Sequence, residues 1–411
     1  MRTVEEHLGV VLAAVGPLPP QRVDLSQALG LVAGTDVLCR VDLPGFDNSA
    51  MDGYAVHAAD VAAASGGAPV RLVVVDDIPA GSAPSRAVEA GQASRIMTGS
   101  MMPQGADAVV PVEDTDAGTQ IVHVRAPAAP GGHVRRQGED LPAGGAVLTA
   151  GAVLDARRIA LVAAAGHADL LVHPRARVAV VSTGAELVEP GRRLAPGQIY
   201  DSNSHLLAAA VARSGGVAAY RSCVGDDPHT LRSLLDRLVE QVDVVVTSGG
   251  VSMGAYEVVK QVLQGPGGVQ FDPVAMQPGK PQGFGVLGSR GVPMFALPGN
   301  PVSAYVSFEV FVRPALRTMM GLTPAVRPTV RARLATPLRS PPGRRQYARA
   351  MAERVAGGWR VTPVRGQGSH FVAALAQADA LIVVPEQVTA VAVDEQVDVL
   401  LLDVPGGRMV P

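Results

Sequence analysis

Hydrophobic residues at the start of the chain recur every three or four positions, which is the spacing of one helix face. The segment 16–20 interrupts this pattern with glycine and prolines, and proline cannot continue a helix because it lacks the backbone donor. The sequence therefore predicts an N-terminal helix before residue 16, with an apolar face made of Val4, Leu8, Val11, Leu12 and Val15.

Between residues 43 and 142 the pattern changes to short runs of β-branched residues, such as 70–75 and 121–124. Glycine and proline clusters bound these runs, as is typical of strands joined by turns. We therefore expect a separate β-rich module over 43–142. Helical character returns at 155–166, so segments 1–42 and 143–175 are predicted to form one discontinuous N-terminal domain.

From residue 176 to 323, nearly continuous apolar runs alternate with amphipathic helical segments. The runs 178–181, 217–224 and 244–246 have the hydrophobicity of strands that are buried on both faces. Repeated βα units of this kind predict a doubly wound parallel sheet, in which ligands bind at the carboxyl ends of the strands.

The last segment, 324–411, returns to short strands with turn residues between them, among them 329–334 and 380–384. Short strands separated in this way are typical of a small β-barrel. The chain as a whole is therefore expected to be a multidomain protein of the α/β plus β class.

Composition and charge narrow the functional classes. Aromatic residues make up 3% of the 411 residues, which argues against stacking platforms for single-stranded nucleic acid. The 35 basic and 37 acidic residues nearly cancel, so no global field attracts nucleic acid or an anionic membrane. Cys39 and Cys223 lack the spacing of a thiolate metal site, and the first residues are charged rather than apolar. We expect a cytoplasmic protein with no nucleic-acid or membrane partner.

A glycine-rich loop, Ser248–Gly254, follows the predicted strand 244–246 and precedes a helix. Free backbone amides at such a loop favour an anion such as phosphate. The loop has neither the lysine of a Walker A motif nor the GxGxxG dinucleotide pattern. Taken alone, it suits a tight strand-to-helix turn as well as a binding site.

Three further loops at predicted strand ends carry polar residues, and they bring Glu186, Asp226 and Asp227 to the same edge of the sheet as Glu257. Carboxylate oxygens on one edge are the ligands that Mg²⁺ prefers, with phosphate oxygens and water completing its shell. Each acid also has a simpler interpretation, because Asp227 can cap its helix and Glu186 can be solvated. Lys280 offers a positive charge for an oxyanion.

A second polar cluster, 47–56, stands beside a strand of the β-rich module and by itself suits a turn. Together with the other motifs, it resembles the molybdopterin molybdenumtransferase family, called MoeA in bacteria, which includes the E domain of gephyrin. The resemblance spans nearly the whole chain and rests on FDNSAMDGYAV (46–56), RIMTG (95–99), GADAVVPVE (105–113), RRQGED (135–140), STGAEL (182–187), QIYDSN (198–203), SGGVSMG (248–254), PGKP (278–281) and LPGNPVS (297–303).

The resemblance implies a four-domain, usually dimeric subunit, which agrees with the changes of pattern at 43, 143, 176 and 324. It also implies the reaction: molybdate and adenylylated molybdopterin are converted to molybdenum cofactor with release of AMP, in a step that depends on Mg²⁺. The alternatives are molybdopterin adenylylation, whose enzymes share the sheet domain, and a dimeric binding scaffold of the gephyrin type.

Residue roles also follow from the resemblance alone. It implies that the β-rich module of one subunit faces the sheet domain of its partner, and that Asp226 and Glu257 bind the metal. The catalytic residues it implies are Asp52, Asp140, Glu186, Asp226 and Glu257. The substrate-binding residues it implies are Thr98, Gly249, Gly250, Ser252, Lys280, Pro298, Pro301, Ser303, Arg349 and Ser369.

The sequence departs from the family pattern at four positions. Ala255 replaces a frequent acid after the glycine-rich loop, and Glu257 replaces the usual aspartate. Gln277 stands where many members have lysine, which removes a positive charge beside PGKP. Asp394 stands where glycine is common in the last domain.

Overall fold

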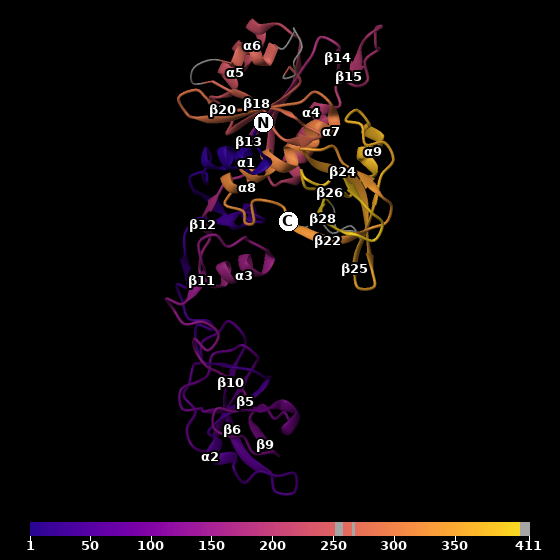
Figure 1. The fold of residues 1–411 in the computed structure, drawn as a ribbon. Coiled ribbons are helices and arrows are strands. Elements are labelled where there is room, and N and C mark those ends of the chain that lie inside the picture. Colours follow the sequence, from indigo (N-terminus) through magenta and orange to yellow (C-terminus); the bar gives the residue numbers. More distant parts are fainter. Residues whose placement is uncertain (251–257, 265–267, 403–411) are drawn as a thin grey trace. The chain divides into compact units, whose positions relative to one another are not determined.

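The computed structural model describes residues 1–250, 258–264 and 268–402, and the chain forms two compact units (Figure 1). One unit consists of Met1–Gln21, Gly30–Gly34 and Leu171–Pro411, and the other of Arg22–Leu29 and Thr35–Leu170. No helix in the described part of the chain has the length and apolar character needed to cross a membrane. Cys39 and Cys223 are both free thiols.

The unit of Arg22–Leu29 and Thr35–Leu170 is built on a five-stranded sheet. Its strand order is β8-β5-β7-β6-β9, and every neighbouring pair is antiparallel except β6 and β7. The strands are β5 (Gly53–Val56), β6 (Val70–Ile78), β7 (Gln92–Ile96), β8 (Ala108–Pro111) and β9 (Ile121–Val124). The predicted runs at 70–75 and 121–124 are thus both confirmed as strands.

Short elements complete this unit. Strands β4 (Asn48–Ser49) and β10 (Val134–Arg135) form one antiparallel pair, and β3 (Val37–Leu38) and β11 (Ala146–Leu148) form another. The helices are η1 (Leu25–Gln27), α2 (Ala58–Val61), η2 (Val112–Asp114) and α3 (Ala156–Ala164). Helix α3 begins where the sequence predicts, because the Asp155 side chain accepts a hydrogen bond from the N–H of Arg158.

A six-stranded mixed sheet forms the centre of the other unit, in the order β16-β13-β17-β21-β20-β18. The first four strands are parallel to one another, as the sequence predicts. Strand β20 is reversed and pairs antiparallel with both β21 and β18, which the pattern did not indicate. The strands are β13 (Arg177–Thr183), β16 (Val217–Val224), β17 (Val244–Ser248), β18 (Gln270–Pro273), β20 (Pro281–Leu287) and β21 (Val292–Leu297).

Helices cover both faces of this sheet. Val178 and Val180 of β13 belong to one apolar core, and Ala179 and Val181 belong to the other, because successive strand residues point to opposite faces. The first core is completed by α1 (Val4–Ala13), α4 (Asn203–Arg213), α7 (Pro301–Ser307), the π-helical η3 (Phe308–Val312) and α8 (Arg313–Met319). The second is completed by α5 (Pro228–Leu238) and α6 (Val258–Leu263).

Helix α1 confirms the predicted N-terminal helix but not its whole apolar face. A capping box between Thr3 and Glu6 starts the helix. Its buried residues are Val4, His7 and Val11, whereas Leu8 is only half-buried. His7 is buried because its ring packs edge-on against Phe311, with 4.7 Å between ring centroids.

The C-terminal segment forms a closed five-stranded barrel, in orange to yellow in Figure 1, as predicted. The ring closes because β24 pairs with both β25 and β26. The barrel strands are β22 (Thr329–Leu334), β24 (Arg345–Val355), β25 (Gly358–Pro363), β26 (Ala380–Val384) and β28 (Gln396–Leu401). The short elements around it are β19 (Met276–Gln277), β23 (Leu338–Arg339), β27 (Ala390–Val391) and α9 (Val372–Gln377).

Five short strands remain in the described part of the chain. Strand β12 (Asp169–His173) pairs with β2 (Val32–Ala33) through Val172 and His173, and β1 (Gln21–Asp24) is mostly exposed. Strands β14 (Leu187–Val188) and β15 (Ile199–Tyr200) form a parallel pair that follows β13. This last pair borders the cavity described next.

Candidate functional site

Three strand ends meet at one edge of the mixed sheet, as the sequence predicts. The ends of β13, β17 and β21 lie in register, with Ser248 paired to both Ser182 and Leu297. The loops that follow are closely packed, because a Cβ on Gly249 would lie 2.4 Å from the carbonyl oxygen of Thr183. Gly249 also has φ +100°, so this loop requires glycine for both space and conformation.

These loops enclose a cavity of about 740 Å³ at the carboxyl edge of the sheet. Ligands of doubly wound sheets bind at this edge. The C-terminal barrel domain contributes His370 and Val372 to the wall. Several predicted site residues line the cavity together: Glu186, Asp226, Gly249, Gly250, Pro298, Pro301 and Ser303. Two others, Ser252 and Glu257, lie outside the described residues.

The two described rim acids are exposed and face the same space. The N–H of Ala185 donates to the carboxylate of Asp226 at 3.0 Å, which fixes that side chain. The Glu186 carboxylate lies over Gly184, where an added Cβ would be 2.7 Å from its nearer oxygen. In the described part of the chain, no group of three or more His, Cys, Asp or Glu residues is placed to hold a metal.

This donor set fits Mg²⁺ better than a transition metal. Glu186 and Asp226 offer only hard oxygen ligands, and they would fill part of an octahedral shell. Mg²⁺ commonly keeps waters and substrate phosphate oxygens in its remaining positions. The described residues thus match a cation that is shared between protein and a phosphorylated ligand.

Asp227, by contrast, has the simpler role that its sequence position allowed. Its side chain accepts a hydrogen bond from the N–H of Thr230 at 2.8 Å and caps α5. Hydrogen bonds from Thr230 hold the pKa of the Asp227 carboxyl below its usual value. Asp227 does not line the cavity formed by the described residues, although it directly follows Asp226.

Sequence reasoning missed Asn203, which joins the strand-end loops. Its side-chain nitrogen donates to Ser248 Oγ at 2.8 Å and to the Gly299 carbonyl oxygen at 2.7 Å. Because Asn203 is the first residue of α4, it connects that helix to the ends of β17 and β21. The QIYDSN motif was the available signal, but hydrophobic patterning carries no information about such a bridge.

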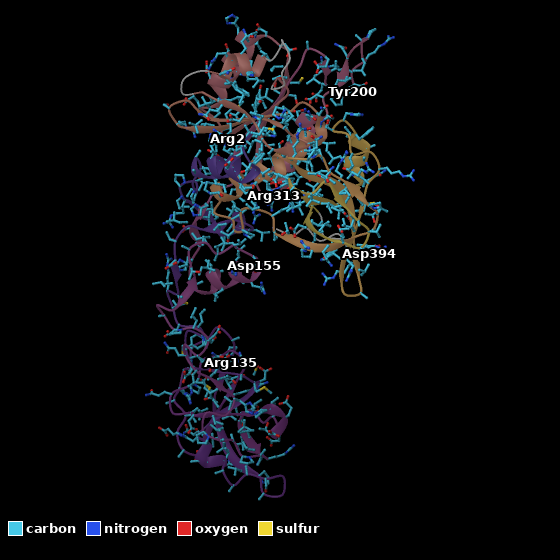
Figure 2. All side chains as sticks on the ribbon, viewed as in Figure 1. Arg2, Arg135, Asp155, Tyr200, Arg313 and Asp394 are labelled. Atoms are coloured by element: carbon cyan, nitrogen blue, oxygen red, sulfur yellow. The ribbon has the colours of Figure 1, made fainter. Side chains whose placement is uncertain are left out.

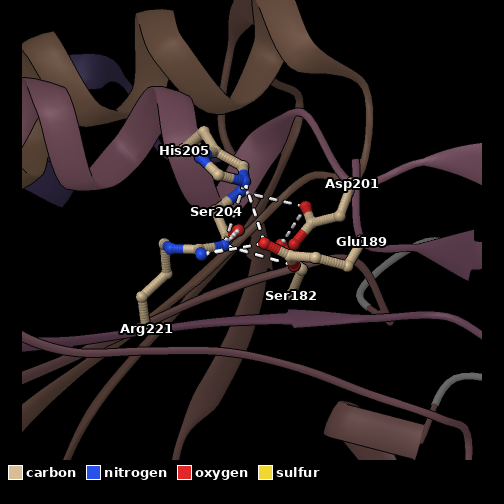
Figure 3. A network of polar contacts seen from close by, with 6 residues as sticks. All are labelled: Ser182, Glu189, Asp201, Ser204, His205 and Arg221. Carbon is tan, nitrogen blue, oxygen red and sulfur yellow. Dashed lines mark hydrogen bonds and ion pairs between the residues drawn. The ribbon is translucent and has the colours of Figure 1, made fainter. Parts of the chain in front are cut away.

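Asp201 was missed as well, and it belongs to a polar network drawn in Figure 3. One oxygen of its buried carboxylate accepts hydrogen bonds from Ser182 Oγ at 2.8 Å and from the Ser204 N–H at 3.0 Å. Arg221 of β16 donates to Ser204 Oγ at 3.0 Å and to Glu189 at 2.9 Å. The hydrogen bond from Arg221 is the main reason that the pKa of Glu189 is lowered.

The same surroundings keep the Cys223 thiol from ionising to the reactive thiolate. Burial, helped by the negative charge of Asp201, raises the pKa of this thiol to about 11. A thiol with so high a pKa stays protonated near neutral pH and is a poor nucleophile or metal ligand.

Lys280 lies beside this site but is exposed and is not among the described residues that line the cavity. The preceding turn is fixed by Gln282, whose side-chain nitrogen donates to the Gly279 carbonyl oxygen and to Ser307 Oγ, both at 2.6 Å. At Gln277, where a lysine was expected from the resemblance, the side-chain oxygen accepts a hydrogen bond from Arg344 at 3.2 Å. A guanidinium is therefore present next to this position.

Arg349 is fully enclosed in the C-terminal domain, with 1% of its surface exposed. Its guanidinium donates to the carbonyl oxygens of Gly366, Gly368 and Phe371 at 2.6, 3.0 and 2.9 Å. These bonds hold the loop that carries Ser369, whose carbonyl oxygen accepts from the N–H of Val302 at 3.1 Å. In the structure Arg349 orders a loop beside the cavity wall.

Asp52, Thr98 and Asp140 belong to the unit that contains the five-stranded sheet. Asp52 accepts hydrogen bonds from the N–H and Oγ1 of Thr98, both at 2.7 Å. These bonds lower the pKa of the Asp52 carboxyl and keep it ionised. Asp140 is exposed, and its N–H donates to the Leu43 carbonyl oxygen at 3.0 Å.

The fold and the cavity together define a multidomain protein with a candidate binding site at the carboxyl edge of its parallel strands. Comparison with protein families agrees with this class. Residues 2–166 match the MoeA N-terminal region (domain I and II), residues 179–318 a probable molybdopterin binding domain, and residues 331–402 the MoeA C-terminal region (domain IV).

The alignments with individual relatives cover nearly the full length of this chain and of each relative. The chain is 48% identical to molybdopterin molybdenumtransferase 2 of Mycobacterium tuberculosis, over 97% of this chain and 99% of that protein. It is 37% identical to the molybdopterin molybdenumtransferase of a Nostoc species, over 98% and 94%. A crystal structure of the molybdopterin biosynthesis MoeA protein from Pyrococcus horikosii superposes with a TM-score of 0.81 at 34% identity, covering 97% and 98%. The chain belongs to the molybdopterin molybdenumtransferase family, a family of transferases.

Proposed function

We propose that this chain inserts molybdate into adenylylated molybdopterin and releases AMP, with Mg²⁺ held by Glu186 and Asp226. The observation that carries the proposal is the cavity that joins these two carboxylates to the Gly249-Gly250 backbone at the carboxyl edge of the sheet. The named relatives act in the same biosynthesis and support this choice of substrate.

Different groups of the chain would orient the metal ligand, approach the phosphate and form the cavity wall. The N–H of Ala185 holds the Asp226 carboxylate in a fixed orientation, and the backbone at Gly249 and Gly250 allows close approach of a phosphate. Bound Mg²⁺ would neutralise phosphate oxygens and promote cleavage of the bond that releases AMP. The loop carrying Ser369 and His370, held by Arg349, places His370 in one wall of the cavity.

The same proposal assigns roles to the remaining predicted site residues. Ser252 and Glu257 would complete the phosphate and metal contacts, and Lys280 would attract molybdate. In a homodimer, Asp52, Thr98 and Asp140 of one subunit would complete the site of the other. The four predicted domains, 1–42 with 143–175, 43–142, 176–323 and 324–411, and a cytoplasmic location also remain part of the proposal.

An insertion assay tests this function directly. Purified protein is supplied with adenylylated molybdopterin, molybdate and Mg²⁺, and AMP release is followed over time. Asp226→Asn should slow AMP release by at least about 100-fold, because it removes a charge from the metal site. Asp227→Asn is the matched control and should stay within about twofold, because asparagine also caps helices and Asp227 does not line the cavity.

Two results would contradict the proposal. AMP release no faster than in a protein-free control would exclude insertion activity. Adenylylation of molybdopterin from ATP by the same sample would assign the chain to the preceding chemical step. Circular dichroism of both variants checks that a slow rate reflects chemistry and not unfolding.

A further inference from the structure

Two residues that line the cavity, Asp201 and Asn203, each carry a buried side-chain oxygen that nothing in the described chain satisfies. Asp201 is 0% exposed and Asn203 is 9% exposed, and both line the cavity. The Oδ2 atom of Asp201 and the Oδ1 atom of Asn203 have no hydrogen-bond partner among the described residues. Buried side-chain oxygens are nearly always hydrogen-bonded, so this pair requires an explanation.

Local structure accounts for the other polar atoms of these two residues. Oδ1 of Asp201 caps the start of α4 through Ser204 and ties it to β13 through Ser182, as Figure 3 shows. The Asn203 nitrogen bridges Ser248 and Gly299. A purely structural role thus uses one oxygen of Asp201 and the nitrogen of Asn203, and it leaves the two remaining oxygens unexplained.

Hydrogen-bond donors or a cation can satisfy this pair of oxygens. The proposed function assigns the cation to Glu186 and Asp226, so we assign hydrogen-bond donors to the pair. A phosphate or molybdate oxygen is itself an acceptor and would be repelled by the Asp201 carboxylate. The nearby Arg221 already donates to Glu189 and Ser204. A partner with two neighbouring N–H or O–H groups would satisfy both oxygens at once, and leaving buried acceptors unpaired is costly.

Among the parts of adenylylated molybdopterin, the pterin ring matches this requirement. Its aminopyrimidinone edge presents an exocyclic amino group beside a ring N–H, so two donors lie next to each other. Adenine instead places its amino group beside a ring acceptor. The ribose has two hydroxyl donors but no flat face, whereas the cavity wall next to Asp201 offers Ile199 and Tyr200.

Tyr200 is suited to cover such a ring. Its hydroxyl donates to the Arg192 carbonyl oxygen at 3.0 Å, which limits the motion of the aromatic side chain. Figure 2 labels this residue, which belongs to β15, and 44% of its surface is exposed. Aromatic faces stack favourably on flat heterocycles.

We propose that Asp201 and Asn203 form the subsite that accepts the N–H donors of the pterin ring, with Tyr200 beside it. This inference rests on the proposed function, because it assigns one end of the same substrate. It separates the cavity into a part that recognises the ring and a rim, with Glu186 and Asp226, that holds the phosphates.

A pair of simple ligands tests the subsite in the unmodified protein. Pterin has the exocyclic amino group, and lumazine has a carbonyl oxygen in its place, so lumazine turns an acceptor toward Asp201. Fluorescence titration of the full-length protein should give at least about tenfold tighter binding of pterin than of lumazine. Equal binding of the two ligands would refute the subsite.

Asp201→Asn then reverses the expected preference. Its side-chain oxygen can still accept from Ser182 and Ser204, while its nitrogen takes the place of Oδ2 and becomes a donor. Lumazine should therefore bind this variant at least as tightly as pterin does, and Asp227→Asn should keep the wild-type preference. An unchanged preference in Asp201→Asn would overturn the assignment.

Titration with AMP separates the two ends of the substrate. AMP affinity should stay within about threefold in Asp201→Asn, because the ring subsite is distinct from the phosphate rim. A loss of AMP affinity with unchanged pterin binding would assign the acceptors to the ribose and refute the proposal. Wild-type protein that releases AMP in the insertion assay but does not distinguish pterin from lumazine would refute only the subsite. Absence of AMP release would refute the proposed function itself.

Discussion

Arg349 gives the sharpest test of how the C-terminal domain shapes the site. The resemblance implies that its charge binds an anion. In the structure its guanidinium instead donates hydrogen bonds to three carbonyl oxygens of a loop. Arg349→Lys separates the two roles, because lysine keeps the positive charge but cannot reach three acceptors at once. Arg349→Met removes both the charge and the hydrogen bonds.

The magnitude follows from the three hydrogen bonds. A hydrogen bond to a charged group contributes about 1.5–3 kcal/mol, but part of this is offset because the guanidinium no longer has to be buried. The acceptor carbonyls of Gly366 and Phe371 belong to exposed residues and can regain water in the variant. We therefore expect the unfolding free energy of the barrel to fall by about 3 kcal/mol in Arg349→Met and by about 2 kcal/mol in Arg349→Lys.

The chain contains one tryptophan, Trp359, which lies in β25 and packs against the barrel core. Urea unfolding followed by its fluorescence therefore reports on the domain that holds Arg349. The KM for molybdate and the kcat of AMP release are measured on the same samples. Unfolding free energies within about 0.5 kcal/mol of the wild type would refute the loop-ordering role. Loss of molybdate affinity in Arg349→Met with full retention in Arg349→Lys would show instead that the charge binds the anion.

Three further predictions concern single residues. Burial lowers the pKa of His7 from 6.5 to about 4, so between these pH values only the unfolded chain binds the proton. The unfolding free energy of the wild type should therefore fall by about 2–3 kcal/mol from pH 7 to pH 4.5. Urea unfolding at both pH values measures this change, and His7→Leu should not show it. Asp394 has φ +64° in the barrel domain, so Asp394→Gly should raise the thermal midpoint, by about 0.5–1 kcal/mol in stability, whereas Asp394→Ala should lower it. Gly249→Ala places its Cβ 2.4 Å from the Thr183 carbonyl oxygen and should abolish AMP release, while Gly225→Ala, which meets no atom within 4 Å, should keep it.

The order of elements could be predicted where one physical rule governs a segment. The strands 178–181 and 244–246 were predictable because residues buried on both faces must be apolar over the whole run. The run 217–224 is also a strand, but the expected burial on both faces is wrong for it, because β16 lies at the edge of the sheet and its residues are exposed or half-buried. The start of α5 was predictable because Asp227 and Pro228 are suited to a helix N-terminus. The reversed direction of β20 was not, because strand direction depends on the pairing partners that a strand finds in the sheet.

The candidate site was predictable only in part. Glu186, Asp226 and Gly249 follow predicted strand ends, and parallel strands bring such ends to one edge. Asn203 and Asp201 were missed because their role depends on the path of the chain from β15 into α4. Arg349 was expected at an anion site from resemblance, and only the coordinates reveal that three carbonyl oxygens surround it.

The sequence by itself determined the class of this protein, because hydrophobic periodicity follows directly from which faces of helices and strands are buried. It also determined the chemical groups available to the site, and the ordered motifs indicated the family. Tertiary structure alone decided which polar atoms of the cavity-lining residues are paired and which remain unpaired. Hydrogen-bond geometry depends on differences of less than an ångström between segments such as β13, α4 and the loop after β21, and no pattern along the chain records those distances.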